Sequence, residues 1–271
     1  EQLTVAGTAT VNGAVSIKDY VQTAGGSSLG GSGTLGITRS FNHSAGTFAP
    51  SGNVSITQAS GNFAFNEALS VASLALAAPT GSLTLNGATT TSGNITLGAV
   101  TGLTINAPIA ASGDFNATVS GASSVTTLTT DVIANGAMTL SLAGGLELPA
   151  VNQSVRLGAG TSQTINAKYL ALTLTGSGTS KIFNVLGPQT IATSGTNGSG
   201  EGLVVRNTGT GADTAGIYNA AGLQTITVNN ADFSRVQGIS GLAFIQSDGN
   251  QTLVVQGASS ANNLLIGSAT N

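Results

Sequence analysis

The segment SGNITL, from Ser92 to Leu97, is the sequence unit that decides the fold. A small residue and a glycine precede hydrophobic side chains at alternate positions, which is typical of a strand with one buried face. Equivalent glycines recur at nearly constant spacing along the first half of the chain, as at Gly93, Gly113 and Gly136. Other copies of the unit begin at Asn12, Ser32, Ser51, Ser60, Thr80, Ser112 and Asn135. Such a period indicates a solenoid in which each repeat stacks on the next to bury its apolar side chains.

The composition favours a folded β protein over a disordered or helical chain. Hydrophobic residues make up 40% of the 271 residues, and charged residues only 6%, against about 25% in an average protein. Disorder needs low hydrophobicity with high net charge, whereas the net charge here is −3. Glycine, serine, threonine and asparagine are poor helix formers, and no apolar run approaches the roughly 18 residues of a membrane span.

Two regions follow each other along the chain, and we expect them to form one continuous solenoid. Residues 1–150 carry the glycine-led unit with little variation. Residues 151–271 instead repeat Gln-Thr before alternating aliphatic residues, at Gln163, Gln189, Gln224 and Gln251, with longer and less regular spacings. We therefore predict an all-β, right-handed parallel β-helix with coils of about 20 residues and longer coils, carrying QT repeats and loops, in the C-terminal half.

The alternating pattern also predicts which side chains point into the coil. We expect an apolar interior that includes Leu83, Leu85, Ile95, Leu97, Leu103, Ile105, Ile226 and Val228. We expect the aromatic residues to be core fillers, namely Phe41, Phe48, Phe63, Phe65 and Phe115. Asparagines near the marker glycine are candidates for stacking on copies of themselves in successive coils, namely Asn53, Asn62, Asn94 and Asn116.

The repeats resemble those of a known class of bacterial proteins. The Ser-Gly-Asn/Asp-hydrophobic units are similar to the repeats of filamentous haemagglutinin-like exoproteins, which are secreted by the two-partner route. The Gln-Thr-Ile repeats resemble those of very large bacterial surface proteins of the same broad type. The resemblance implies a right-handed parallel β-helix in an extracellular protein of the bacterial cell surface, with an adhesive or structural function.

Charge distribution limits the partners. No lysine or arginine occurs between Arg39 and Arg156, and nucleic-acid binding needs clustered cations, so we expect no nucleic-acid partner. We also expect no membrane span. The partners we expect are neighbouring β-helix segments, from the same chain or from other copies, and glycans of a host or of another cell surface.

The sequence offers little material for catalysis, and we predict that the protein is not an enzyme. His43 is the only histidine, and Asp19 is the nearest acidic residue before it. A Ser-His-Asp triad needs three such groups to converge, so we interpret His43 as a turn or surface residue. We predict no catalytic residues and no cofactor.

Calcium is the one ligand ion for which the sequence holds weak candidates. Asp114 and Asp131 are separated by almost one coil, and neither has a cation one coil away by this count. Asp213 lies in GTGAD, which matches half of a calcium-binding nonapeptide. We interpret all three as solvated corner carboxylates and predict no metal site.

Three other functions stay open at this point. The chain begins and ends within the strand pattern, so a subunit of a filament or sheath that stacks β-helices end to end is one alternative. A polysaccharide-active β-helix enzyme is the second. An ice-binding solenoid is the third, and Thr127–Thr130 and Leu172–Thr175 hint at the flat threonine ranks that it needs.

Overall fold

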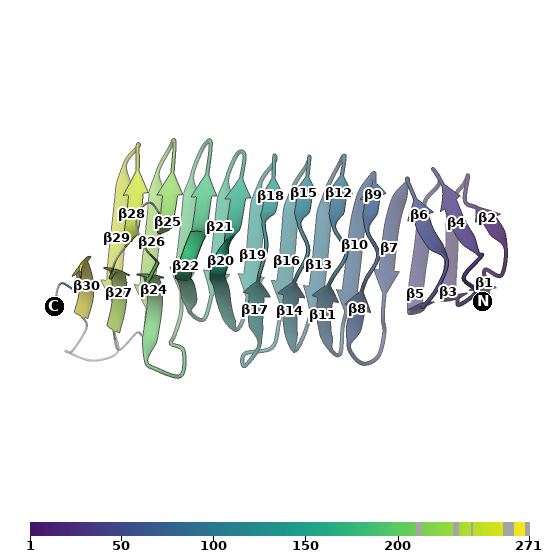
Figure 1. Ribbon diagram of the computed structural model, residues 1–271, viewed down its shortest axis with the longest axis horizontal. Coiled ribbons are helices and arrows are strands. Elements are labelled where there is room, and N and C mark those ends of the chain that lie inside the picture. Colours follow the sequence, from purple (N-terminus) through teal and green to yellow (C-terminus); the bar gives the residue numbers. More distant parts are fainter. Residues whose placement is uncertain (210–212, 230–232, 240, 257–262, 269–271) are drawn as a thin grey trace.

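The protein is an elongated solenoid of strands. The computed structural model describes residues 1–209, 213–229, 233–239, 241–256 and 263–268. The strands of this part stack along one long axis, with the strands Gln2–Thr4 and Asn263–Ser268 at opposite ends (Figure 1). They complete about 10 turns of about 23 residues each, and neighbouring strands pair in parallel. This confirms the predicted parallel β-helix. None of the described elements is a helix of the kind that crosses a membrane.

Three parallel ladders run along the solenoid. The first ladder contains, in order, β1 (Gln2–Thr4), β3 (Val15–Gln22), β5 (Leu35–His43), β7 (Asn53–Thr57), β10 (Ser73–Ala78), β13 (Ile95–Ala99), β16 (Phe115–Val119), β19 (Met138–Leu142), β21 (Gln163–Ala167), β23 (Gln189–Thr193), β26 (Gln224–Asn229) and β29 (Gln251–Gln256). The second ladder contains β8 (Phe63–Phe65), β11 (Ser82–Leu85), β14 (Gly102–Ile105), β17 (Val125–Leu128), β20 (Gly145–Ala159), β22 (Leu170–Asn184), β24 (Glu201–Asn207), β27 (Phe233–Gly238) and β30 (Asn263–Ser268). The third ladder contains β9 (Leu69–Val71), β12 (Thr89–Thr91), β15 (Ile109–Ala111), β18 (Val132–Ala134), the second halves of β20 and β22, β25 (Thr214–Asn219) and β28 (Leu242–Ser247). A short sheet of β2 (Thr8–Thr10), β4 (Ser28–Gly31) and β6 (Thr47–Pro50) precedes it, and β6 contacts β9.

Coil length increases toward the C-terminus, as the QT spacing predicts. Ile95 pairs in register with Phe115, and Phe115 pairs in register with Met138, so the coil is already slightly longer at the second step. The step from Gln189 to Gln224 is 35 residues. The number of residues that pair in register stays about the same from strand to strand in the first ladder. The additional residues therefore lengthen the connections between strands, and they lengthen β20 and β22.

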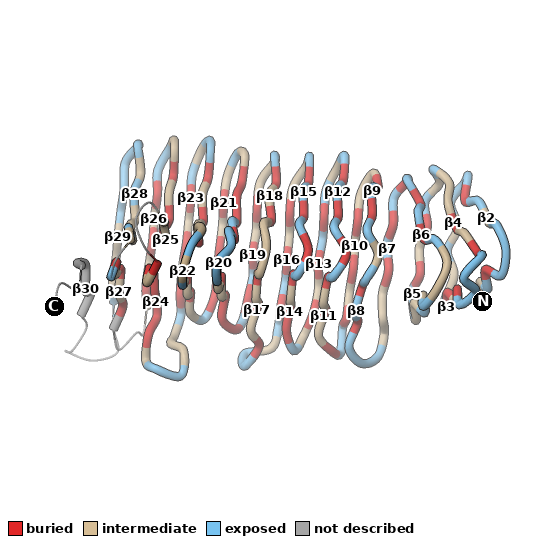
Figure 2. The backbone as a smooth tube through the Cα atoms, viewed as in Figure 1, coloured by how far each residue is buried: buried red, intermediate tan, exposed pale blue. Residues whose placement is uncertain are grey.

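The interior of the coil is mainly apolar, and the side chains predicted to fill it point inward. All eight side chains predicted to point inward are at most 1% exposed. Leu85 shows the arrangement, because it pairs in register with Phe65 in the preceding coil and Ile105 in the next, and all three are 0% exposed. Buried residues therefore alternate with half-buried or exposed ones along many strands, as in β11 and β13 (Figure 2).

Aromatic side chains fill the N-terminal coils. Phe48, Phe63, Phe65 and Phe115 are buried, which confirms the prediction for these four. Phe41 is only partly buried, but it packs against the core, and its ring contacts the rings of Phe48, Phe63 and Phe65.

A ladder of glutamine side chains runs through the interior of the C-terminal half. Gln163 takes the position that Met138 holds one coil earlier, and Gln189, Gln224 and Gln251 follow in register. Gln189 Nε2 donates to Gln163 Oε1 at 2.7 Å, and Gln224 Nε2 donates to Gln189 Oε1 at 2.7 Å. Gln251 Nε2 donates to Gln224 Oε1. Each buried amide is therefore satisfied by its neighbours, as a buried polar group requires.

The predicted asparagine stacks form at other positions. Asn66, Asn86 and Asn106 bond to one another, with Nδ2 of Asn86 2.8 Å from Oδ1 of Asn66 and Nδ2 of Asn106 2.9 Å from Oδ1 of Asn86. The four asparagines predicted to stack on their own copies do not do so. Asn53, Asn62 and Asn94 accept hydrogen bonds from a serine hydroxyl or a backbone N–H in the next coil, and Asn116 pairs in register with Thr139. The residue at the equivalent position one coil later is not asparagine, so these amides have no copy to bond.

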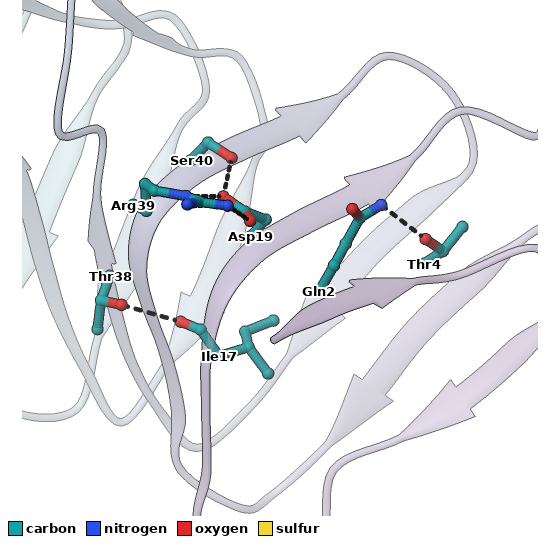
Figure 3. A network of polar contacts seen from close by, with 7 residues as sticks. All are labelled: Gln2, Thr4, Ile17, Asp19, Thr38, Arg39 and Ser40. Atoms are coloured by element: carbon teal, nitrogen blue, oxygen red, sulfur yellow. Dashed lines mark hydrogen bonds and ion pairs between the residues drawn. The ribbon is translucent and has the colours of Figure 1, made fainter.

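An ion pair between β3 and β5, near the N-terminal end of the first ladder, joins two coils (Figure 3). Asp19 accepts hydrogen bonds from Arg39 Nε at 2.7 Å and from Ser40 Oγ at 2.7 Å, and Arg39 Nη2 forms the ion pair. Hydrogen bonds from Arg39 and then from Ser40 lower the pKa of Asp19 from 3.8 to about 2.

We predict that Asp19 links stability to pH only in strong acid. Because its folded pKa is depressed, its contribution to the free energy of unfolding is complete above pH 3.8 and is lost as the pH falls through about 2. An NMR titration of the Asp19 carboxyl carbon should give a midpoint near 2. In Arg39→Gln the midpoint should move back toward the ordinary aspartate value. A wild-type midpoint at the ordinary value would contradict the ion pair.

Candidate functional site

The outer surface of the C-terminal half is the most chemically varied part of the molecule. Five of the seven cationic residues lie after residue 151, namely Arg156, Lys168, Lys181, Arg206 and Arg235. Longer connections project from the solenoid here, including the one between β23 and β24 at the lower edge in Figure 1.

Unequal connections along one corner of the solenoid create a notch. Two of these connections are very short. One joins the end of β19 at Leu142 to the start of β20 at Gly145, and the other joins the end of β21 at Ala167 to the start of β22 at Leu170. Longer connections flank them, with residues 120–124 on one side and residues 194–200 on the other. The depression between them, which we call the corner notch, has a volume of about 290 Å³ and is lined by residues from both flanking loops together with Lys168 and Tyr169.

Internal hydrogen bonds hold both flanking loops. Asn197 organises the longer loop, because its Oδ1 accepts from the N–H groups of Ser199 at 2.9 Å and Glu201 at 3.0 Å. Its Nδ2 donates to Glu201 Oε2 at 2.9 Å. In the shorter loop, Ser124 Oγ donates to the Gly121 carbonyl at 2.5 Å. The walls of the corner notch are therefore fixed by local bonds.

Tyr169 forms the floor of the corner notch. It lies beside Gly145, because the register that pairs Leu146 with Leu170 continues to the preceding residues. A β-carbon on Gly145 would overlap Cζ, Cε1 and Oη of the ring, so the ring lies flat across the glycine. Tyr169 Oη donates to Glu147 Oε1 at 2.7 Å. Burial and this hydrogen bond raise the pKa of Tyr169. One ring face rests on the sheet and the other faces outward, into the notch.

A second depression, of about 260 Å³, lies on the other side of the 194–200 loop. Its lining includes Asn197, Glu201, Arg206 and Arg235. Glu201 pairs with Arg235, with 2.5 Å between Oε1 and Nη2. Arg206 is exposed and forms no ion pair with another described residue, and the same holds for Lys168 in the corner notch.

Phe183 and Phe244 also cover glycines on the third ladder, namely Gly158 and Gly216. Together with Tyr218 they form an aromatic patch around Lys181. A β-carbon on Gly158 would lie within 2.7 Å of Cζ, Cε1 and Cε2 of Phe183, so this ring is also flat on the sheet. Lys181 Nζ lies 4.7 Å from the ring centre of Tyr218 and 5.9 Å from those of Phe183 and Phe244. Burial, and secondarily the charge of Arg156, lower the pKa of Lys181. The ammonium group occupies the space between the rings, so the patch is packed by its own cation.

We predict that Gly158→Ala destabilises the protein by about 1–3 kcal/mol, because the added methyl overlaps a packed ring. Gly98→Ala is the matched control, since its nearest neighbour is the β-carbon of Ala77 at 3.9 Å. Denaturant unfolding measures both. In a Phe183→Ala background the Gly158→Ala penalty should largely disappear, and a penalty that persists there contradicts the packing of Phe183 on Gly158.

The side chain of His43 is buried, so its interpretation as a turn or surface residue is wrong. It lies in β5, its side chain is 5% exposed, and its Nδ1 is 2.6 Å from Glu67 Oε1. The rings of Phe41 and Phe48 pack beside it. Asp19, the acidic residue considered in the sequence, bonds Arg39 instead. His43 follows Phe41 by two residues in β5, so the two side chains lie on the same face of the strand. The aromatic stack therefore continues inward from Phe41 to His43.

The three carboxylates considered for calcium bind backbone N–H groups of adjacent coils. Asp114, just before β16 of the first ladder, accepts from the Ala137 N–H at 2.8 Å. Asp213 accepts from the Gly178 N–H at 2.9 Å. No group of three or more histidine, aspartate or glutamate side chains that could hold a metal occurs among the described residues.

The expectation that Asp131 lacks a cation one coil away is wrong, because Asp131 pairs with Arg156. It precedes β18 of the third ladder, so it lies at a different corner from Asp114. Its Oδ1 accepts from the Arg156 N–H at 2.9 Å, and its Oδ2 accepts from Arg156 Nε at 3.0 Å. The expectation failed because this coil is 25 residues long, longer than the repeats of the N-terminal half, which brings Arg156 opposite Asp131.

The comparisons with known proteins give no relative. No family model matches the chain, and neither a curated protein nor a solved structure matches it. The fold and the surface chemistry are therefore the observations that bear on its function.

Proposed function

We propose that the chain is a structural repeat segment of an extracellular bacterial surface protein, an adhesin-like stalk that provides reach and rigidity. The observation that carries the proposal is the first ladder, which connects twelve strands from β1 to β29 in one sheet. With about 4.8 Å between strands, the ladder spans roughly 50 Å, so each added coil extends the rod without a hinge. The resemblance of the repeats to filamentous haemagglutinin-like exoproteins supports the same proposal.

The surface chemistry agrees with a stalk. Corner carboxylates such as Asp114 and Asp131 bind the backbone of the next coil, and the interior is filled by stacked apolar side chains. Both features stabilise the repeat itself. The proposal includes no enzymatic activity, and turnover of pectin or alginate by the purified chain would contradict that part of it.

Surface location and rod shape are tested separately. Antibodies raised against the chain should label intact source cells, and labelling only after permeabilisation would overturn the extracellular assignment. Small-angle X-ray scattering of the purified chain should give the profile of a stiff rod with a longest dimension of at least about 50 Å. A compact sphere of the same mass would overturn the stalk.

End-to-end assembly is a second candidate, favoured by the strand edges. Among the described strands, β1 and β29 are the outermost of the first ladder, and an open strand edge pairs readily with another chain. We expect sedimentation velocity to show species that lengthen with concentration if assembly is the function. A chain that stays monomeric at high concentration contradicts the assembly candidate and leaves the stalk proposal standing.

A further inference from the structure

We propose that the corner notch binds an acidic oligosaccharide, with a sugar ring stacked on Tyr169 and one carboxylate directed to Lys168. The chain of sugars continues over the 194–200 loop into the second depression, where Arg206 binds a further carboxylate. This inference goes beyond a stalk, because it assigns a ligand site to the outer surface. It does not depend on the stalk function, because ligand binding is measured by calorimetry, whereas surface location is measured by antibody labelling and rod shape by X-ray scattering.

The shape of the notch is set by the solenoid. Its two walls stand three coil steps apart, on the coils of β17 and β24, with the coils of β20 and β22 between them. At about 4.8 Å per step, the walls are roughly 14 Å apart. This width admits a chain of sugar rings lying on the floor, and the depression is open to solvent along the corner.

The floor presents an aromatic face outward. Side chains of a sheet normally stand perpendicular to it, but Tyr169 lies flat because Gly145 beside it has no β-carbon. The bond from Tyr169 Oη to Glu147 fixes the ring in this position. The face of an aromatic ring is electronegative, so it packs favourably against the C–H face of a pyranose.

The walls supply polar groups of the kind that bind sugar hydroxyls. The hydroxyls of Ser123 and Thr196 line the notch. Since the hydrogen bonds of Asn197 and Ser124 already hold the two loops, little ordering is required when a ligand binds, which favours affinity.

Charge selects an acidic ligand. Lys168 and Arg206 lie on the two sides of the 194–200 loop, and neither forms an ion pair with another described residue. The nearby carboxylates are engaged, Glu147 by Tyr169 and Glu201 by Arg235 and Asn197. Two exposed cations are too few for nucleic acid, which needs a cluster. The floor is a sheet face rather than a strand edge, so it does not fit peptide binding by strand addition.

Calorimetry with short galacturonate oligomers tests the proposal, with neutral galactan oligomers of matched length as the comparison. We expect the galacturonate to bind, and its affinity to fall as salt is raised. We expect the neutral oligomers to bind more weakly. An NMR experiment should place the shifted amides around Gly145 and Tyr169.

Variants separate the two parts of the site. Tyr169→Ala should weaken binding by at least about tenfold, as for an aromatic hot spot, whereas Tyr169→Phe should retain most of the affinity because the ring remains. Phe183→Ala is the matched control, since Phe183 lies flat on Gly158 outside the notch. Lys168→Gln and Arg206→Gln should each weaken binding by about 2–5-fold, and Lys18→Gln, another exposed cation, should not.

Each contrary result overturns the proposal. Absence of galacturonate binding at millimolar concentration rules out the site. Binding that survives Tyr169→Ala places the ligand elsewhere. Equal affinity for neutral oligomers contradicts the acidic class, and equal displacement by a short RNA shows a general anion surface instead.

Discussion

Leu85→Asp is expected to destabilise the protein by at least about 3 kcal/mol, since it combines the loss of a packed leucine with a buried polar group. Leu85 is 0% exposed and lies between Phe65 and Ile105 in the stack. An aspartate there has no cation to pair with in the apolar interior. Denaturant unfolding followed by circular dichroism measures the change.

Thr84→Asp is the matched control for this substitution. Thr84 is the preceding residue of β11, and its half-buried side chain lies on the outer face. The same charge should therefore cost little there. Equal effects at residues 84 and 85 would contradict the assignment of the inward face, and so would a Leu85→Asp protein as stable as the wild type.

Gln189→Leu is expected to cost about 2–4 kcal/mol, because it breaks the glutamine ladder in its middle and each orphaned buried group costs about 1–3 kcal/mol. Gln189 accepts from Gln224 and donates to Gln163 and to the Tyr218 carbonyl at 3.2 Å. The substitution leaves Oε1 of Gln163 without that donor inside the coil. Thermal and denaturant unfolding measure the loss.

Replacing the three buried glutamines of the ladder together, and leaving the exposed Gln251 in place, gives the sharper comparison. When both partners of a buried hydrogen bond become apolar, the change is close to neutral. The triple variant with leucine at Gln163, Gln189 and Gln224 should therefore be more stable than Gln189→Leu alone. If the triple variant loses the sum of three single penalties, the side chains act independently and the ladder is not a network. Thr190→Ala is the control, because it changes the neighbouring residue on the outer face of β23 and leaves the glutamine ladder intact.

The sequence predicts the fold well because the fold depends on local alternation and a nearly constant period. Leu83 and Leu85 share a face by strand geometry alone, and the glycine steps then place them opposite Leu103 and Ile105. The glutamine ladder was within reach of the same reasoning. In QTINA, Gln163 lies two residues before Ile165 and so shares its buried face. A polar side chain at that position does not by itself indicate an inward direction, because its burial depends on partners in the neighbouring coils.

The candidate site depends on register between coils of unequal length, which the sequence does not display. Tyr169 covers Gly145 and Arg156 reaches Asp131 only because these coils are longer than the repeats of the N-terminal half. If the repeat length of the N-terminal half is applied to the C-terminal half, neither pair of residues is predicted to be in register. Phe183 lies on the outer face of β22 because it alternates with the buried Ile182 and Asn184. Its ring lies flat because the same register places it beside Gly158.

The orientation of the ladders determines how the protein responds to mechanical force. Strands lie across the long axis (Figure 1), so the hydrogen bonds between coils run along it and a pull on the ends loads them one coil at a time. A coil of 20 to 35 residues that detaches gives up about 5 Å of rod and releases roughly 70–120 Å of extended chain. A force–extension record in optical tweezers would resolve these releases as separate steps, whereas a single cooperative rupture would contradict coil-by-coil detachment. Under tension such a tether lengthens in increments and dissipates energy at each one, while the coils that have not detached keep their shape.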